Sequence, residues 1–418
     1  MVDFRDVALE SLKNILNKKQ DVFQMDETNE DNAFVMMLML TALRKLVYIK
    51  SILKTLITKK LSKQNVVGQC ALILGATELI YMKTPDYAVI NSYVNLVKEK
   101  TDKYVAGFVN AVLRKIAKQK DIFISADKGD FFPQEFKALL KKSYSTKEIE
   151  KIERSSQNIP MLDVTCISEE SAQKLGGKKL SLGSLRLEVK GKISELPDYD
   201  KGTWWVQDFS SALPIKMLED VKGKKVLELC AAPGGKTAQL LTRGAKVTCL
   251  DVSANRLNIL QENMNRLNLK PEKIICEDGL RFLDETNEKY DIIVLDAPCS
   301  ATGTLRRHPE IVHVKTQNDV MEQAKLQKEF LDKIDRAMKV GGMLLYCTCS
   351  LCKEEGEFQI KEFLENNENY DIVNLKNKMP KDLEKMVTKE GFVRVLPCYA
   401  DSFGGADGFF IACIKKEK

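Results

Sequence analysis

Apolar residues recur with a helical period along the first 142 positions of the chain. Within Phe4–Leu16 they fall at positions 4, 7, 8, 9, 12, 15 and 16, close to the 3.6-residue repeat of an amphipathic helix. Similar patterns run through 33–62, 65–83, 88–100 and 104–119, separated by short polar links. Because no convincing strand pattern interrupts them, we predict an all-α domain over residues 1–142.

The pattern changes between residues 143 and 201. Ser145 and Glu148 have the spacing of a capping box, so a helix is expected to begin there. From Met161 onward, short alternating runs with glycines, such as Leu180–Val189, replace the helical period. We therefore predict a small α+β linker domain over residues 143–201.

Beyond residue 202 apolar strands alternate with helices. Strands are predicted at 225–230, 245–251, 274–278, 290–296 and 343–348, with helices such as 253–268 between them. This alternation is typical of a parallel doubly wound sheet, which binds ligands at the carboxyl ends of its strands, beside the switch in strand order. We predict a Rossmann-like α/β domain over residues 202–418 with its site at that edge.

Charge and hydropathy limit the classes of partner that the chain can have. Residues 31–120 contain 15 Lys/Arg and 5 Asp/Glu, a balance of +10, whereas the whole chain carries +6. A basic module favours a polyanionic partner, although a solvated helical surface would have the same charge. The longest apolar run, Ala33–Leu43, is too short to span a bilayer, and Asp3, Asp6 and Glu10 argue against a signal peptide. We expect a cytoplasmic protein without a membrane partner.

The loop CAAPGGKT, Cys230–Thr237, follows the first strand of the α/β domain. Its last three residues look like the end of a P-loop, but Cys230 occupies the place of that motif's first glycine. The dinucleotide fingerprint is absent as well. What remains is a glycine pair, which lets a ligand approach the backbone closely.

Three acids, Asp251, Asp278 and Asp296, follow three strands along the same edge. The acid after the second strand suits a ribose diol. Three carboxylates would repel a triphosphate but suit a cationic sulfonium ligand. The residues therefore favour S-adenosylmethionine, with helix capping as the alternative role for any one acid.

Three cysteines, Cys347, Cys349 and Cys352, cluster at the end of the fifth strand. They could form a metal site or a redox pair, or one could be a nucleophile. No second CxxC and no paired histidines complete a zinc site. A thioredoxin-like pair would follow the first strand rather than the fifth. Both features favour the nucleophile.

Several motifs resemble those of the RNA cytosine-C5 methyltransferases. In front of them, Gly107–Arg114 resembles the NusB-like RNA-binding domain that precedes the catalytic domain in the bacterial members acting on small-subunit ribosomal RNA. The resemblance implies a Rossmann-like methyltransferase fold over 202–418 behind a NusB-like domain over 1–142, with S-adenosylmethionine as cofactor, no metal, 16S ribosomal RNA as partner, and a monomer. The matching motifs are Leu227–Thr237, Asp296–Gly303, Arg306–Pro309, Tyr346–Ser350 and Asp407–Phe410.

The family pattern also implies roles for individual residues. Cys349 maps to the nucleophile and Cys299 to the cysteine that assists product release, while Asp296 is placed to contact N3 of the cytosine. Arg306 and Arg307 are candidates for RNA phosphate contacts, with surface ion pairing as the alternative. The expected cofactor contacts are Cys230, Ala231, Ala232, Pro233, Gly234, Gly235, Lys236, Asp251, Asp278 and Asp296.

The chain departs from the family pattern in two places. Cys347 stands where relatives usually have Ser or Ala, and residues 311–315 replace a stretch that typically contains Trp. Both departures concern fine RNA contacts rather than the chemistry.

Two other functions compete with this interpretation. A NusB-like domain alone would suggest a non-catalytic RNA-binding or antitermination factor, against which the intact pair Cys299 and Cys349 argues. A DNA cytosine-C5 methyltransferase also has a Pro-Cys motif, but it uses that cysteine as nucleophile and needs no Cys349. We expect an rRNA (cytosine-C5)-methyltransferase that transfers a methyl group from S-adenosylmethionine to C5 of a specific cytosine in 16S rRNA, through a covalent cysteine adduct at C6.

Overall fold

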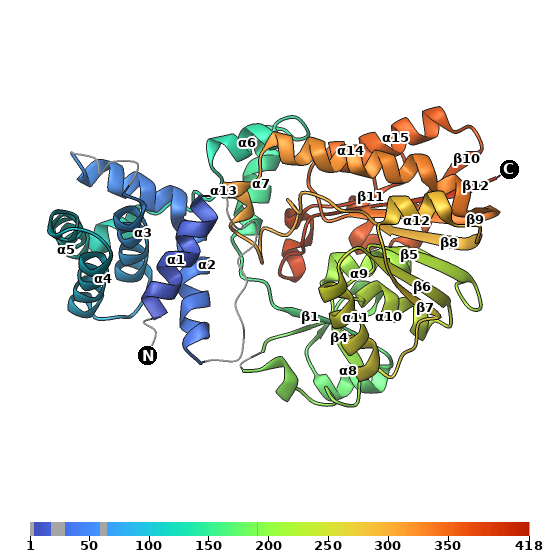
Figure 1. Cartoon of the computed structure of the whole chain (residues 1–418), viewed down its shortest axis with the longest axis horizontal. Helices are drawn as coiled ribbons and strands as arrows, with labels where there is room; N and C mark the ends of the chain where they lie inside the picture. The colour runs from blue at the N-terminus through green and yellow to red at the C-terminus, as the bar shows by residue number, and fades with distance from the viewer. Residues whose placement is uncertain (1–3, 18–29, 59–64, 190, 418) are drawn as a thin grey trace. The chain divides into compact units, whose positions relative to one another are not determined.

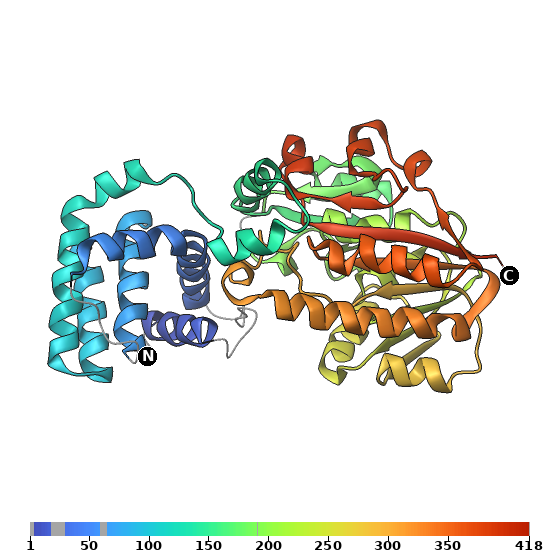
Figure 2. The same ribbon diagram turned by 90° about the horizontal axis from the view of Figure 1, so that it is seen from above.

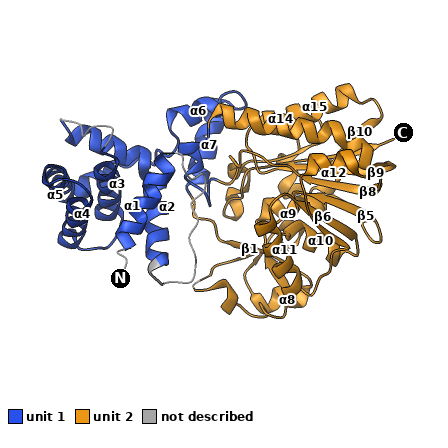
Figure 3. Ribbon diagram, viewed as in Figure 1, with its two compact units in different colours: residues 1–157, 305–315 blue, residues 158–304, 316–418 orange. Residues whose placement is uncertain are grey.

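A computed structural model describes residues 4–17, 30–58, 65–189 and 191–417 (Figure 1). Contacts divide the chain into two compact units, coloured separately in Figure 3. Unit 1 comprises Met1–Gln157 and Leu305–Lys315, and unit 2 comprises Asn158–Thr304 and Thr316–Lys418.

Unit 1 is helical, as its apolar period predicts. The predicted helix over 33–62 ends at Leu56, and its positions 59–62 lie outside the described residues. The capping box is confirmed, with the Ser145 N–H donating to Glu148 Oε2 over 2.8 Å. The helices are α1 (Phe4–Leu16), α2 (Glu30–Leu56), α3 (Val66–Tyr81), α4 (Asp86–Lys100), α5 (Lys103–Ala126), α6 (Gln134–Leu140) and α7 (Thr146–Ser156).

Helix α2 extends beyond the apolar run Ala33–Leu43, which by itself is too short to span a bilayer. The helix continues through Arg44 and Lys45, and the stretch Asn32–Leu56 contains an 18-residue window with a mean hydropathy of 1.5. By length and composition alone this stretch could cross a membrane. In the structure, residues along it such as Leu46 are fully buried in the hydrophobic core of unit 1, the environment of a core helix.

A segment from far along the chain completes unit 1. Residues 305–315 include the short helix α13 (Ile311–Val314), and the Val314 side chain joins the core of α1–α5. His313 Nε2 lies 2.8 Å from the Leu43 carbonyl oxygen, and Arg44 Nη2 donates to the Arg306 carbonyl over 2.7 Å. Burial lowers the pKa of His313 to about 4, so its ring is neutral at pH 7.

Unit 2 begins with a small antiparallel sheet of order β2-β3-β1-β4. The buried guanidinium of Arg186 bonds Asp163 Oδ1 over 2.6 Å and the Gly405 carbonyl over 2.8 Å, which ties this sheet to the end of the chain. For this reason no structural break separates residues 158–201 from the rest of unit 2, whereas α7, placed in the predicted linker, groups with unit 1. The elements are β1 (Leu162–Cys166), α8 (Glu169–Leu175), β2 (Lys178–Lys179), β3 (Ser184–Leu187) and β4 (Trp204–Val206).

The main sheet of unit 2 has the order β10-β12-β9-β8-β5-β6-β7, with β11 paired to β12. The five predicted strands are present and parallel to one another. The predicted parallel doubly wound sheet is confirmed for these five strands, and at one edge β10, β11 and β12 add antiparallel pairs that the sequence analysis did not include. The strands are β5 (Lys225–Leu229), β6 (Lys246–Asp251), β7 (Lys273–Cys276), β8 (Tyr290–Asp296), β9 (Met338–Thr348), β10 (Tyr370–Val373), β11 (Val393–Val395) and β12 (Phe409–Lys416).

Helices cover both faces of this sheet (Figures 1 and 2). Along β8, Ile292 and Val294 belong to one core and Ile293 and Leu295 to the other, as expected for a strand buried on both faces. Because β5 lies between β6 and β8, the strand order switches there, and a ligand site is expected at the carboxyl ends. One face packs against α9 (Phe209–Lys216), α10 (Gly235–Thr242) and α11 (Ala254–Arg266), the other against α12 (Gly279–Glu285), α14 (Gln317–Ile334) and α15 (Glu357–Asn366).

The place of Val314 in the core of unit 1 leads to a prediction. Val314→Asp buries a charge among the helices and should destabilise unit 1 by roughly 2–5 kcal/mol. Hydrogen exchange should show faster exchange in α1–α5, although the substitution lies nearly 190 positions beyond α5 (126 to 314). Val340→Asp, at a valine that is 67% exposed, is the matched control. Unchanged protection of α1–α5 in Val314→Asp would contradict the division into units.

Candidate active site

The two cysteine motifs meet at the carboxyl ends of β8 and β9. Asp296 and Cys347 face each other in the parallel register, and the Ala297 N–H donates to the Cys347 carbonyl over 2.9 Å. Beyond these strand ends the sulfur atoms of Cys299 and Cys349 lie 3.3 Å apart, both partly exposed. The structure thus brings together the two cysteines that the sequence analysis selected.

Backbone contacts hold the loops that carry these cysteines. The Gly303 N–H donates to the Cys349 carbonyl over 2.9 Å, and the Gly408 N–H donates to the Gly303 carbonyl over 2.8 Å. A Cβ atom added to Gly303 would lie 2.0 Å from the Gly408 oxygen, so no side chain fits there. The Asp407–Phe410 motif, quoted from the sequence without a role, therefore supplies the backbone that closes the site.

Four cysteines of this region, Cys299, Cys347, Cys352 and Cys230, have raised thiol pKa values and are therefore protonated at pH 7. The hydrogen bond with Cys349, followed by burial, raises the pKa of Cys299 well above its ordinary range. Burial and the Asp296 charge do the same for the pKa of Cys347, and burial raises the pKa of Cys352 and Cys230 to about 12. Thiols held protonated in this way are poor nucleophiles. Within the described residues, no group of three or more His, Cys, Asp or Glu side chains is arranged to hold a metal.

Asp296, whose side chain is 34% exposed, forms an ion pair with the buried Lys236. Lys236 Nζ lies 2.7 Å from Asp296 Oδ2, and Cys347 Sγ lies 3.4 Å from Asp296 Oδ1. Burial disfavours the lysine charge, but the charge of Asp296 outweighs it, so the pKa of Lys236 is raised and the ammonium persists. Cys347 therefore contacts the predicted catalytic acid, which is a role that the sequence did not suggest.

The predicted cofactor loop Cys230–Lys236 lies beside this pair, at the amino end of α10. Cys230 (φ 60°) and Gly234 (φ 100°) both adopt left-handed backbone conformations. The loop is further fixed to the end of β6, because the Ala232 N–H donates to Asp251 Oδ2 over 3.2 Å. The charges of Asp296, Asp251 and Asp278 all reach the Cys230 thiol of this loop, and three such carboxylates fit a nucleoside carrying a cationic sulfonium group.

The other two carboxylates have local partners. Asp251 also accepts from the Ser253 N–H over 3.0 Å and lies 3.4 Å from Arg256 Nη1. Asp278 caps α12, accepting from the Arg281 N–H over 3.0 Å. The capping alternative thus describes Asp278 as it stands, and its role toward a ligand stays a prediction.

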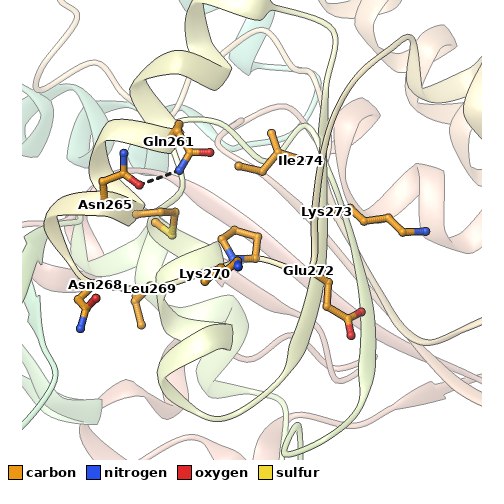
Figure 4. A pocket seen from close by; sticks show the side chains of 10 residues that line it. Gln261, Asn265, Asn268, Leu269, Lys270, Glu272, Lys273 and Ile274 are labelled. Carbon is orange, nitrogen blue, oxygen red and sulfur yellow. Dashed lines mark hydrogen bonds between the residues drawn. The ribbon is translucent and has the colours of Figure 1, made fainter.

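A separate surface pocket of about 510 Å³ lies elsewhere in unit 2 (Figure 4). Gln261 and Asn265 of α11 line it, together with Lys270–Ile274 leading into β7. It adjoins the amino end of β7, whereas the cysteines lie at the carboxyl ends. It contains none of the predicted site residues.

The predicted RNA contacts differ from each other in exposure. Arg306 is 1% exposed, so it presents almost no surface to a phosphate in this structure, and its RNA contact stays a prediction. Arg307 is exposed, and its role stays a prediction. His308 Nδ1 lies 3.3 Å from Glu310 Oε1, in keeping with a loop residue.

Glu228 and Glu355, which are both buried near the site, were not recognised in the sequence analysis. Glu228 on β5 is 1% exposed and accepts from Thr237 Oγ1 over 2.7 Å. Glu355 is fully buried beside the cysteine loops. Glu228 could have been recognised, because it is an acid inside the apolar strand predicted at 225–230. Glu355 could not, because the polar run Lys353–Glu357 has the pattern of an exposed helix start.

With this geometry established, the chain can be compared with known proteins. Residues 215–415 match the family described as 16S rRNA methyltransferase RsmB/F, and residues 2–118 match the NusB family. Ribosomal RNA small subunit methyltransferase B of Pasteurella multocida is 32% identical over 89% of this chain and 85% of its own, and that of Vibrio cholerae is 31% identical over 82% and 83%. The chain belongs to the ribosomal RNA small subunit methyltransferase B family.

Solved structures agree on the fold. The crystal structure of PH0851 superposes over 100% of this chain and 99% of its own with a TM-score of 0.77 at 21% identity. The methyltransferase homolog protein from Pyrococcus horikoshii covers 68% of this chain and 99% of its own, with a TM-score of 0.53 at 26% identity. As a member of the methyltransferase B family, the chain is an S-adenosylmethionine-dependent rRNA methyltransferase with a NusB-like helical region in front.

The burial of Glu228 makes stability depend on pH. Its pKa rises from an ordinary 4.5 to about 8 because burial disfavours the charge, so its contribution to stability is full below pH 4.5 and lost as the pH rises through 8. Glu228→Gln should remove this loss and raise stability above pH 8 by a few kcal/mol, since one pKa unit corresponds to about 1.4 kcal/mol. Melting of the variant and the wild type at pH 5 and pH 8.5 measures the difference, with Glu219→Gln, 82% exposed, as control. Parallel pH curves would refute the assignment.

The cofactor assignment rests on Asp251 and can be tested separately. Asp251→Asn keeps the shape of the side chain but removes the charge that would strengthen hydrogen bonds to a ribose. S-adenosylmethionine affinity should fall by roughly 1–3 kcal/mol, measured by calorimetry. Asp284→Asn, at an exposed carboxylate on α12, should bind normally. Equal affinities in both variants would count against the ribose contact.

Proposed function

We propose that the chain methylates C5 of a cytosine in 16S rRNA through a covalent adduct between Cys349 and C6. The observation that carries this proposal is the 3.3 Å separation of the Cys349 and Cys299 sulfurs beside Asp296, at the ligand edge of the sheet. S-adenosylmethionine supplies the electrophilic methyl group when bound.

Cys349 acts as the nucleophile. C5 of cytosine is a weak nucleophile, and addition of a thiolate to C6 gives C5 the character of an enamine carbon. Cysteine suits this step because a thiolate both attacks readily and leaves readily. The surroundings of Cys347 and Cys352, which keep both protonated, favour Cys349 over these neighbours.

Cys299 serves the final elimination. After methyl transfer a base removes the C5 proton, the C5–C6 double bond reforms, and the Cys349–C6 bond breaks with its electron pair going to sulfur. A protonated Cys299 within 3.3 Å can donate a hydrogen bond to that departing sulfur. This role needs a thiol with a raised pKa, which the surroundings of Cys299 provide.

Asp296 assists the addition at N3. Protonation of N3 draws electrons from the ring and favours thiolate attack at C6, and the Asp296 carboxylate can accept a hydrogen bond from the protonated N3. Lys236 holds one Asp296 oxygen at 2.7 Å, which restricts the rotation of the carboxylate. We assign Lys236 to orientation of Asp296 as well as to the cofactor loop.

The helical region contributes RNA affinity in this proposal. Residues 31–120 carry the +10 balance, and Arg114, Lys115 and Lys118 of α5 are exposed. Phosphate contacts from such a surface supply salt-dependent binding without sequence readout. We further propose a cytoplasmic monomer that needs no metal. Of the two arginines predicted to contact RNA, we retain the exposed Arg307 and leave out Arg306, because Arg306 is buried.

The two competing functions make different demands on the cysteines. A non-catalytic RNA-binding factor has no use for two sulfurs at 3.3 Å on the ligand edge. A DNA-type methyltransferase would use Cys299 as nucleophile, and the raised pKa of that thiol argues against it.

The roles of the two cysteines predict opposite variant phenotypes. Cys349→Ala cannot add to C6, so it should give neither methylated RNA nor a covalent adduct. Cys299→Ala should add and methylate but release slowly, and so accumulate a protein–RNA adduct stable to denaturing electrophoresis. Cys352→Ala is the matched control and should behave like the wild type. Cys347→Ala loses the contact with Asp296 but keeps both Cys299 and Cys349, so it should accumulate no adduct. An adduct in Cys349→Ala but not in Cys299→Ala would reverse the roles and support the DNA-type mechanism.

A further inference from the structure

A fully buried carboxylate lies behind the two cysteine loops. Glu355 ends the short 3-10 turn η4 (Lys353–Glu355) and is 0% exposed. Its Oε1 accepts from the Ser300 N–H over 2.7 Å and from Gln327 Nε2 over 3.2 Å. Its Oε2 accepts from the Ser300 hydroxyl over 2.5 Å and from the Ser350 hydroxyl. Four donors from three separate parts of the chain therefore converge on one side chain.

The donors lie directly beside the reacting sulfurs. Ser300 follows Cys299 and Ser350 follows Cys349 in the sequence. One carboxylate oxygen, Oε2, accepts from both hydroxyls and so joins the two loops at residues 50 positions apart. The position of each sulfur relative to the other depends on where these two serines are held.

Neighbouring contacts strengthen this junction. Gln327 of α14 also donates to the Pro298 carbonyl over 2.7 Å, one residue before Cys299. The Leu351 N–H donates to Thr302 Oγ1 over 3.0 Å, which joins the loops a second time. Burial raises the pKa of Glu355 and the serine hydrogen bonds oppose this rise, so the carboxylate is costly to keep buried and its hydrogen bonds offset that cost.

We propose that Glu355 is a positioning residue that holds Cys299 and Cys349 at reacting distance by joining Ser300 to Ser350. This inference rests on the proposed roles of the two cysteines. Glu355 contacts neither sulfur, so it acts through the serines, and its loss should affect turnover rather than binding. Misplacement of a reacting group by about 1 Å can lower a rate by roughly 100-fold.

Two variants and one control test the proposal in the full-length protein. Glu355→Ala removes the acceptor for all four donors. Glu355→Gln keeps the volume and one acceptor oxygen, so its effect should have the same direction and a smaller size. Glu354→Ala changes the adjacent, half-buried acid of the same turn and is the matched control. Thermal melting and S-adenosylmethionine affinity establish that each variant is folded.

The first measurement is turnover on 16S rRNA. In Glu355→Ala we expect kcat to fall by roughly 10- to 100-fold, with the KM for RNA and the affinity for S-adenosylmethionine close to those of the wild type. A general loss of structure would instead weaken the binding of both substrates. Glu354→Ala should retain wild-type kcat.

The second measurement reports the positions of the sulfurs without catalysis. Diamide accepts two electrons and two protons from a pair of thiols, so a disulfide forms where two sulfurs can approach from 3.3 Å to bonding distance, about 2.05 Å. The rate of Cys299–Cys349 disulfide formation, followed by peptide mass spectrometry, should fall in Glu355→Ala and Glu355→Gln but not in Glu354→Ala. This readout stays informative even where no methylation occurs.

The outcomes separate this inference from the proposed function. Wild-type protein that forms the disulfide but no Cys349 adduct with RNA containing 5-fluorocytidine, from which release is blocked, would refute the proposed function and leave the disulfide rates to decide the role of Glu355. A folded Glu355→Ala variant with both kcat and disulfide rate near those of the wild type would overturn the inference. Should Glu355→Ala fail to melt cooperatively, the same result in Glu355→Gln would overturn it.

Discussion

Asp296 and Cys347 face each other across the parallel strands β8 and β9, and this register sets the geometry of everything beyond it. Three residues after Asp296 and two after Cys347, the chain reaches the sulfurs that lie 3.3 Å apart. A slip of one residue would turn every side chain on β9 to the opposite face and separate them. The buried alternation of Ile292–Leu295, packed on both faces, fixes that register, so the hydrophobic core positions the chemistry.

The sequence predicted those parts of unit 2 that depend on local pattern. Apolar runs bounded by turns marked the five parallel strands, because such strands are buried on both faces. Three antiparallel strands were missed. β10 and β11 have only four and three residues, with 3-10 turns between them, and the start of β12 was quoted only as part of the Asp407–Phe410 motif. The two active-site cysteines were recognised from motif resemblance, and no period or spacing in the sequence could have shown that their sulfurs meet.

The features that were missed depend on tertiary contacts. Arg306 is polar and follows a loop, so it reads as exposed, yet it is buried within unit 1. Glu355 lies in a charged run, and only the fold shows that Ser300 and Ser350 enclose it. In both cases a polar side chain is buried because distant residues surround it, and sequence patterns carry little information about such partners.

The segment 305–315 gives the helical unit a structural role beyond RNA affinity. It begins two residues after Gly303, which is hydrogen-bonded to Cys349, and its Val314 completes the core of α1–α5. A protein that lacks residues 1–142 would lose the helices that surround this segment. Loss of activity in such a truncation therefore cannot be attributed to weaker RNA binding alone.

The central claim is that Cys349 forms the covalent bond to the cytosine. RNA containing 5-fluorocytidine tests this most directly. With fluorine in place of hydrogen at C5, the base has no proton to remove after methyl transfer, so the adduct cannot be released by elimination. Incubation of the wild-type protein with this RNA and S-adenosylmethionine, followed by nuclease digestion and peptide sequencing by mass spectrometry, identifies the linked residue. Our account predicts a methylated fluorocytidine attached to Cys349. A nucleotide attached to Cys299, or methylation without any linked peptide, would contradict it.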